Sequence, residues 1–337
     1  MNSSETRTDR VAGARPSVSL SGGSSVALPA TISRRVGLSD LRVFPIALSG
    51  TAFGWTADGP TTTAILDRFV ELEGTIIDTA DSYAGGRSEI MIGHWMRSRG
   101  NRNALTISTK VGKSADHPGL GAPAIRVAVE ASLRRLRVDH IDLLFLHVDD
   151  RSVSFDETLL AVDELIRAGH VRYFGGSDHT GERLLEARIA AGQLDVAHMV
   201  ALQKHYNLVH RHEYEGDLAR VATQLGLAVF PRYALAGGFL AGAYRGRADL
   251  PREKRAAEAS QYVNRRGLKV LAALDRVAAE MSTQVATAAL AWLLSRPRVV
   301  APVVSVTAPE QLDALMAAPR TSLSRHLLTE LDRASAG

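Results

Sequence analysis

The sequence predicts an α/β protein in which eight strand–helix units close into a barrel of the (β/α)8, or TIM, type. Short apolar runs alternate with longer stretches whose apolar residues recur three and four positions apart, which is typical of helices buried on one face. Continuous apolar runs indicate parallel strands that are buried on both faces. The runs are 44–48, 75–78, 104–109, 141–146, 171–175, 198–202, 227–231 and 299–304.

An open, doubly wound sheet is the main alternative to a barrel. Such a sheet usually carries a glycine-rich phosphate turn after its first strand, but the first run here ends Leu48-Ser49-Gly50-Thr51. A glycine pattern at 119–124 lies well past its strand, and its Pro123 indicates the first turn of a helix instead. Eight units with short links therefore favour the closed barrel.

Three further segments complete the predicted architecture: an N-terminal leader, a hairpin and a long loop. Residues 1–32 are rich in Ser, Gly and Ala, and we expect a disordered leader, with a processed targeting segment as the alternative. Residues 33–337 are predicted to form a single barrel domain that opens with a β-hairpin within 34–49. The longest irregular stretch, about 236–262, is interpreted as a long loop after the seventh strand that closes over a cofactor.

Local signals place several helices. Apolar residues share one face of the stretch 125–136, and serine caps are expected at Ser154 and Ser282.

Composition excludes several functional classes. The net charge of +4 comes from 40 basic and 36 acidic residues without a long run of one sign, so no nucleic-acid partner is expected. The chain has no cysteine, which excludes disulfides and cysteine-ligated metals and fits a cytoplasmic location. No apolar run reaches the roughly 18 residues of a membrane span, so no membrane partner is expected. Oligomeric state stays open.

Four ionisable residues follow consecutive predicted strands. Asp78 ends the second run and Tyr83 follows it closely, while Lys110 and His147 follow the third and fourth runs. Each residue alone has an ordinary structural explanation, as a cap, a solvated amine or a packed imidazole. Because active sites of such barrels lie at the C-terminal ends of the strands, the four together predict one catalytic site.

This set suits the reduction of a carbonyl group. Hydride addition leaves an alkoxide that needs a proton, and a free tyrosine has a pKa of about 10, which is high for an acid near neutrality. We expect Lys110 to lower the pKa of Tyr83 and Asp78 to hold the lysine. His147 is expected to donate a hydrogen bond to the carbonyl oxygen. Trp55, after the first strand, is either a substrate wall or a packing residue.

The chain resembles the aldo-keto reductase family, and in particular bacterial sugar- and natural-product-type reductases that also resemble potassium-channel β subunits. The matching segments run in the family's order from about residue 34 to 320: 77–83 with 86–89, 108–112, 132–136 with 139–143, 147–150, 169–172, 203–208 and 235–240. The resemblance implies an NADP-dependent reductase of an aldehyde or ketone, with NADPH as the cofactor and NADH as the alternative. It also implies these cofactor-binding positions: Gly50, Thr51, Asp78, Ser177, Asp178, Gln203, Arg232, Tyr233, Leu235, Gly237, Ser305, Thr307 and Gln311.

Three of these positions depart from the family's pattern. Asp178 replaces the usual Asn, and an ionised Asp can only accept hydrogen bonds. Arg232 replaces an aromatic residue that stacks on the nicotinamide, a role that its own plane or Tyr233 could take over. Thr307 replaces an Arg that grips the 2′-phosphate of NADP, and Arg245 or Arg298 could compensate.

Other functions receive less support. His205, His210 and His212 are interpreted as loop histidines, because they lack the i, i+4 spacing of a helical zinc site, and no metal is expected. No Gly-x-Ser-x-Gly motif indicates a serine hydrolase. Two alternatives to a reductase stay open: a cofactor-binding regulatory or partner subunit with little turnover, and an NAD-dependent alcohol or sugar dehydrogenase.

Overall fold

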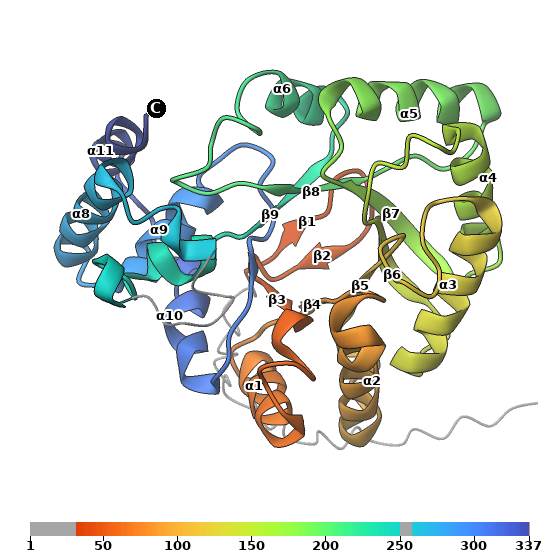
Figure 1. The fold of residues 1–337 in the computed structure, drawn as a ribbon, viewed down its shortest axis with the longest axis horizontal. Coiled ribbons are helices and arrows are strands. Elements are labelled where there is room, and N and C mark those ends of the chain that lie inside the picture. Colours follow the sequence, from red (N-terminus) through yellow and green to blue (C-terminus); the bar gives the residue numbers. More distant parts are fainter. Residues whose placement is uncertain (1–31, 250–257, 337) are drawn as a thin grey trace, which may run out of the picture. The chain divides into compact units, whose positions relative to one another are not determined.

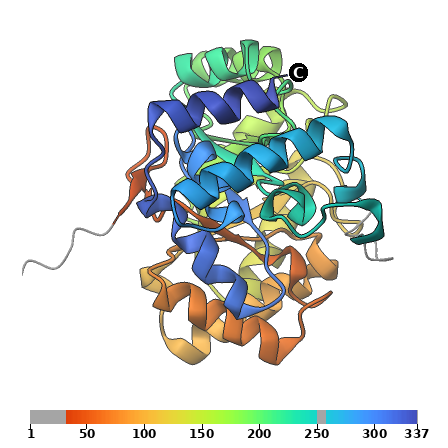
Figure 2. The same cartoon turned by 90° about the vertical axis from the view of Figure 1, so that its left-hand side faces the viewer.

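The computed structural model describes residues 32–249 and 258–336 and confirms the predicted barrel. Eight parallel strands pair in the order β10-β3-β4-β5-β6-β7-β8-β9, and helices surround them (Figures 1 and 2). The strands are β3 Ala47–Ser49, β4 Ile76–Asp78, β5 Thr106–Val111, β6 Ile141–Leu146, β7 Val171–Ser177, β8 Ala201–His205, β9 Ala228–Arg232 and β10 Val303–Val304. The α-helices are α1 Gly59–Glu71, α2 Arg87–Arg99, α3 Ala122–Leu136, α4 Phe155–Arg167, α5 Gly181–Leu194, α6 Asp217–Gln224, α8 Arg265–Glu280, α9 Val285–Leu294, α10 Leu312–Met316 and α11 Arg325–Ser335.

The predicted hairpin is present and covers the N-terminal end of the barrel. Its strands β1 Arg34–Arg35 and β2 Arg42–Val43 are antiparallel. Val36 and Leu41 of its loop and Val43 are buried in one apolar cluster with barrel residues such as Leu143 and Phe145. Burial of these side chains closes the end of the barrel opposite the strands' C-termini.

The last part of the sheet differs from the predicted continuous strand 299–304. Val300 donates a backbone hydrogen bond to Val229 of β9, whereas only β10, after Pro302, pairs with β3. Proline has no N–H to continue a strand ladder. The predicted strand is therefore divided: its first part, at Val300, pairs with β9, and its second part, β10, pairs with β3.

Three predicted strands end too early. Lys110, Ser177 and Gln203 lie within β5, β7 and β8 and not after them. The apolar runs understate these strands because their C-terminal residues face a polar site instead of the apolar core.

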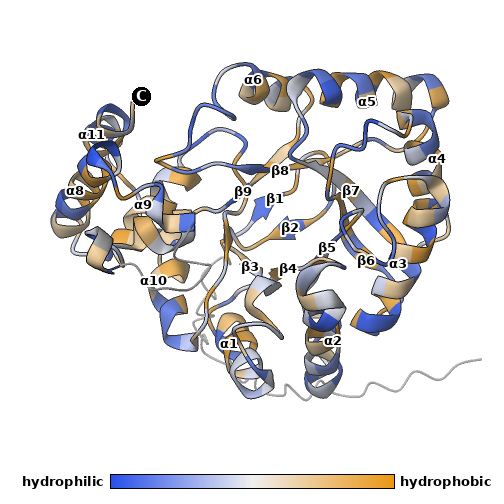
Figure 3. Ribbon diagram, in the orientation of Figure 1, coloured by the Kyte–Doolittle hydropathy of each residue, from blue (hydrophilic) through white to orange (hydrophobic). Residues whose placement is uncertain are grey.

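The helices pack with their apolar faces toward the sheet. Figure 3 shows polar and apolar residues alternating around outer helices such as α5 and α8. The cap at Ser154 is confirmed, because its side chain accepts a hydrogen bond from the backbone N–H of Glu157. The cap at Ser282 is wrong: Ser282 has φ of +50°, and α9 begins after Gln284.

The predicted long loop after the seventh barrel strand begins with a 3-10 turn, η4 Ala236–Ala241, and a second, η5 Arg247–Asp249. Residues 250–257 of the loop, and residues 1–31 of the predicted leader, lie outside the described part of the chain.

Within the described residues, no single helix is long and apolar enough to cross a membrane. Helices α8 and α9 pass that test only as a pair, and they are bent by 97° at their junction.

Candidate active site

The barrel's C-terminal rim is polar at the inward-facing position of every strand. Successive residues of a strand face opposite sides, so residues two positions beyond the inner apolar cluster point into the rim. Ala47, Ile76, Phe145 and Val303 belong to that cluster. Extending the alternation along each strand gives the inward set Ser49, Asp78, Lys110, His147, Ser177, Gln203, Arg232 and Ser305.

Asp78 and Lys110 form a buried ion pair on adjacent strands. The Lys110 Nζ lies 2.6 Å from Asp78 Oδ2, and the two side chains are 0% and 2% exposed. Lys110 also donates to the Thr79 carbonyl at 2.8 Å. The other Asp78 oxygen accepts from Ser108 at 2.7 Å and from the Gln203 amide at 3.3 Å. Both charges are therefore well compensated and fixed in place.

Tyr83 completes a chain of contacts from this pair to the rim. Its hydroxyl lies 3.3 Å from Lys110 Nζ. Burial raises the pKa of Tyr83; the positive charge of Lys110 acts to lower it, and Asp78 acts to raise it. The expected direction of the lysine's effect is therefore right, but the expected net lowering of the tyrosine's pKa is wrong. Burial also acts to lower the pKa of Lys110, but the attractions of Asp78 and Tyr83 outweigh it, so that the pKa is raised.

His147 lies beside the tyrosine as a neutral imidazole. The rings of Tyr83 and His147 meet edge to face, with centroids 6.0 Å apart. Burial first, and then the charges of Lys110 and Lys113, lower the pKa of His147 to about 2. Its Nδ1 is buried and has no hydrogen-bond partner among the described residues. A neutral imidazole has one N–H donor and one acceptor nitrogen, so His147 can donate a hydrogen bond without carrying a charge.

A buried network outside the barrel wall fixes the loop that carries Tyr83. Thr109, on the outward face of β5, donates to Glu89 at 2.6 Å, and Arg135 donates to the same carboxylate at 2.7 Å. Gly86, with φ of +82°, brings the loop so close to Arg135 that a Cβ would lie 2.8 Å from its Cδ. Sequence reasoning assigned no role to Glu89 or Arg135, although both fall within the matched segments.

Asp178 and Arg232 pair across the opposite side of the rim. The Arg232 guanidinium contacts both Asp178 oxygens, at 3.0 and 2.8 Å, and lies 4.8 Å from the centroid of the Tyr233 ring. Asp178 has φ of +61°, a conformation that Asn and Asp tolerate better than most residues. The Asp therefore preserves the backbone shape available to an Asn, and its charge is matched by the Arg. Sequence reasoning treated the two departures separately and missed this pairing.

Other residues of the predicted cofactor site also meet. Thr51 donates to Ser305 at 2.9 Å, and the Thr307 backbone N–H donates to Gln311 at 2.9 Å. Gly50 approaches Ser88 so closely that a Cβ would lie 2.4 Å from its hydroxyl, which gives this glycine a packing role as well.

The segment after β9 turns through left-handed backbone. Tyr233, Ala236 and Gly237 have φ of +52°, +51° and +67°, and Leu235 lies between them. Tyr233 is 42% exposed, so its ring can meet a ligand.

Arg245 and Arg298 were suggested to bind the 2′-phosphate in place of the Arg that Thr307 replaces, but both are engaged in other contacts. Arg298 donates to the carbonyl of Leu227, just before β9 begins, and so lies at the N-terminal end of the barrel. Arg245 forms a bidentate ion pair with Asp275. The suggestion that Arg298 reaches the cofactor is therefore wrong.

Trp55 is 61% exposed in the loop after β3 and its first 3-10 turn, η1 Gly50–Ala52. Of the two readings from sequence, a packing residue and a substrate wall, this exposure favours the second.

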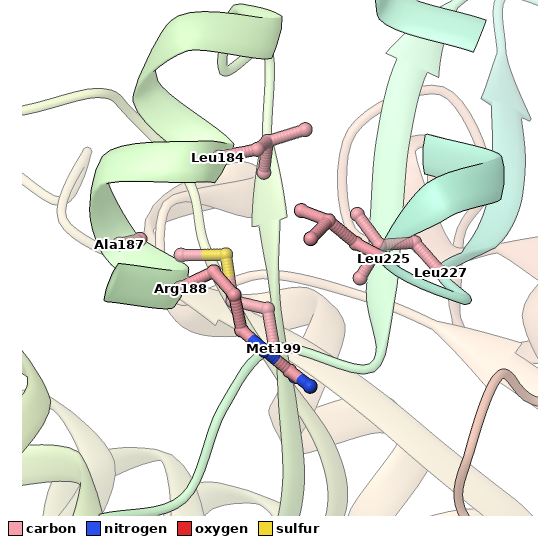
Figure 4. Close-up of a pocket in the computed structure, with 6 residues that line it drawn as sticks. All are labelled: Leu184, Ala187, Arg188, Met199, Leu225 and Leu227. Atoms are coloured by element: carbon pink, nitrogen blue, oxygen red, sulfur yellow. The ribbon is translucent and has the colours of Figure 1, made fainter. Parts of the chain in front are cut away.

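A small pocket elsewhere plays no part in the rim. Figure 4 shows it between α5 and the segments that precede β8 and β9. Because Met199 and Leu227 stand just before their strands, it belongs to the N-terminal side of the barrel. Its lining is Leu184, Ala187, Arg188, Met199, Leu225 and Leu227.

The fold and the rim together define a (β/α)8-barrel protein with a buried, charge-paired site at the C-terminal ends of its strands. The family model of the aldo/keto reductase family matches residues 46–336. The chain belongs to this family of oxidoreductases.

Curated relatives cover most of the chain. It is 31% identical to an uncharacterized oxidoreductase, YrpG, of Bacillus subtilis, over 88% of this chain and 94% of that protein. It is 31% identical to norsolorinic acid reductase stcV of Emericella nidulans, over 88% of this chain and 79% of that protein. It is 30% identical to a probable voltage-gated potassium channel subunit beta of Arabidopsis thaliana, over 85% of this chain and 90% of that protein.

Proposed function

We propose that the protein is an NADPH-dependent reductase that converts an aldehyde or ketone, such as a sugar or natural-product carbonyl, to an alcohol with Tyr83 as the general acid. The observation that carries the proposal is the unbroken contact chain from Asp78 through Lys110 to the Tyr83 hydroxyl. Relatives that are named reductases support the reducing direction.

Tyr83 would hold its proton until the carbonyl oxygen gains charge. Its raised pKa keeps the hydroxyl protonated at neutral pH. As the proton leaves toward the alkoxide, the ammonium of Lys110 stabilises the phenolate that forms. Asp78 keeps that ammonium charged within a buried site.

His147 would orient the substrate. Since its pKa is about 2, it stays neutral and offers a hydrogen bond to the carbonyl oxygen beside Tyr83. Two donors that converge on one oxygen fix both its angle and its distance from the acid. Trp55 would form the outer wall of the substrate site.

The rim fits a nicotinamide cofactor. The Arg232 guanidinium and the exposed Tyr233 ring offer flat surfaces for stacking, and Ser177 and Gln203 offer hydrogen-bonding groups for a carboxamide. Thr51 and Ser305 would lie along the ribose and phosphates, with Leu235 and Gly237 in the turn beside them. When bound, the cofactor supplies the hydride.

The Tyr83→Phe variant tests the proposal. Removal of one hydroxyl should lower kcat by roughly 10³-fold against a panel of aldehydes and ketones, while the dissociation constant of NADPH, measured by fluorescence, changes little. Tyr173→Phe is the matched control, because that hydroxyl lies at the opposite end of the barrel beside Asp40. Turnover of Tyr83→Phe at the wild-type rate would refute the role of Tyr83.

Two alternatives have specific support. The channel-subunit relative and the unusual Asp178–Arg232 pair favour a cofactor-binding partner subunit, which would bind NADPH tightly without oxidising it across the same panel. Thr307 favours an NAD-dependent dehydrogenase, which would show a lower dissociation constant for NADH than for NADPH.

A further inference from the structure

The loop after β8 gathers three potential metal ligands. His210, His212 and Glu213 each offer one nitrogen or oxygen atom, and these three atoms lie within 4.8 Å of one another. From these contacts we propose that His210, His212 and Glu213 bind one divalent transition-metal ion of the zinc class. The proposal does not depend on the reductase function, and it revises the sequence-based expectation of no metal.

The backbone holds this loop in one shape. Asn207 and His210 exchange two backbone hydrogen bonds, which close a tight turn. The Asn207 side chain accepts from Val209 at 2.9 Å and donates to the Tyr233 carbonyl at 2.8 Å. Arg211 points the other way and pairs with Glu215 at 2.8 Å. The turn therefore directs His210, His212 and Glu213 to one side without a helix, which is why helical spacing rules missed them.

The ligand geometry needs little adjustment. Zinc binds imidazole nitrogen and carboxylate oxygen at about 2.0–2.2 Å, so two ligand atoms on one tetrahedral ion lie roughly 3.3 Å apart. His210 Nε2 and Glu213 Oε1 are already 3.0 Å apart. His212 and Glu213 are exposed, so their side chains can rotate to bring the third atom in. Water would complete a tetrahedral shell.

The chemistry of His210 suits a metal ligand. Its Nε2 is buried and makes no well-oriented hydrogen bond to any residue in the described ranges. An imidazole nitrogen is a common zinc ligand in proteins. Its other neighbour is the His205 ring, stacked at 3.7 Å between centroids, which supports His210 from behind.

One cation competes with the metal. Lys204 Nζ lies 3.0 Å from Glu213 Oε2, the oxygen that does not face His210. A bound ion would share the carboxylate with this ammonium and be repelled by it. Removing the charge of Lys204 should therefore strengthen metal binding, an effect that loss of an ordinary surface ion pair would not produce.

Titration of the purified full-length, untagged protein with Zn²⁺ in a calorimeter tests the site. We expect one Zn²⁺ per chain in the micromolar range, with Mg²⁺, which prefers oxygen ligands, not binding there. His212→Ala and Glu213→Gln should each weaken Zn²⁺ binding by roughly tenfold or more, and Lys204→Met should strengthen it. His326→Ala, at an exposed histidine of α11, is the matched control.

Two results of the Zn²⁺ titrations would contradict the metal site. Equal Zn²⁺ affinity in wild type, His212→Ala and Glu213→Gln would overturn the proposal, as would an equal loss in His326→Ala. Thermal unfolding of each variant without metal verifies that it is folded. The titration needs neither cofactor nor substrate, so a failure here leaves the proposed reductase function untouched, and the reverse also holds.

Discussion

The two sides of the barrel rim differ in how their charges are held. On one side, Lys110 and Asp78 are 0% and 2% exposed and are fixed by strand neighbours. On the other side, Arg232 and Asp178 are each 29% exposed. The first pair lies within adjacent strands, whereas Asp178 lies in a loop and meets the last residue of β9. Loss of one partner from a buried ion pair strongly destabilises the fold, because the remaining charge is left without compensation. A partly exposed pair can instead exchange its contacts for contacts with water or a ligand.

This difference matches the tasks we propose for each side. Proton delivery needs one fixed geometry between donor and acceptor. A cofactor enters and leaves, and the residues that receive it need freedom to give up contacts. The predictions below test whether the two sides behave as differently as their burial implies.

Lys110→Met should have the largest effect. It leaves the Asp78 carboxylate buried without its cation, so we expect a loss of about 3–5 kcal/mol in the free energy of unfolding and roughly 10³-fold in kcat/KM. Urea denaturation and steady-state kinetics measure the two losses. Lys269→Met, at an exposed lysine of α8, is the matched control.

The double variant Asp78→Asn with Lys110→Met separates stability from chemistry. Removing both charges should recover part of the lost stability, because no buried charge is left unpaired. Turnover should stay low because the tyrosine still lacks its ammonium. Recovery of turnover together with stability would show that Lys110 acts only in folding.

Asp81→Asn should change how stability depends on pH. Burial, and then the nearby Glu89, raise the pKa of Asp81 to about 7, although Arg135 acts to lower it. Between its ordinary pKa near 4 and pH 7, the folded state keeps a proton that the unfolded state releases, so stability falls as the pH rises. This carboxyl should cost about 3 kcal/mol of stability between pH 5 and pH 8.

Asparagine cannot ionise, so urea denaturation of Asp81→Asn at these two pH values should show a smaller decline than wild type. The exposed Asp116→Asn variant should decline as wild type does. A decline of equal size in Asp81→Asn and wild type would mean that Asp81 does not retain its proton.

The arrangement of the rim side that carries Asp78 and Lys110 was largely predictable from sequence. The pairing of Asp178 with Arg232 on the other side was not. Apolar runs locate strands, and chain direction puts Asp78, Lys110 and His147 at one rim. The alternation of faces along β5 could also have placed Ser108 beside Asp78. The same logic could have excluded Arg298 from the rim, because this residue precedes its strand and so lies at the other end of the barrel.

Contacts between loops follow no such period. The Asp178–Arg232 pair joins residues 54 positions apart, and its geometry depends on left-handed backbone at Asp178 and Tyr233. The histidine loop is similar, because a backbone turn at Asn207 determines where its rings point. Ser282 shows that even a local signal can fail. Serine is a common helix cap, but the left-handed backbone of Ser282, with φ of +50°, differs from the extended backbone of a cap residue.

The smallest expected effect concerns the Asp178–Arg232 pair. We expect Asp178→Asn and Arg232→Met each to raise the dissociation constant of NADPH by roughly threefold to tenfold, because Asp178 orients the guanidinium that we propose for stacking on the cofactor. If the two residues act as one unit, the double variant should bind NADPH no more weakly than either single variant. Fluorescence titration of the four proteins measures this coupling, and the exposed pair on α6, changed by Arg220→Met and Asp217→Asn, is the control. Strictly additive losses would mean that the two residues contact the cofactor independently, and that their pairing is incidental to the difference between the two sides of the rim.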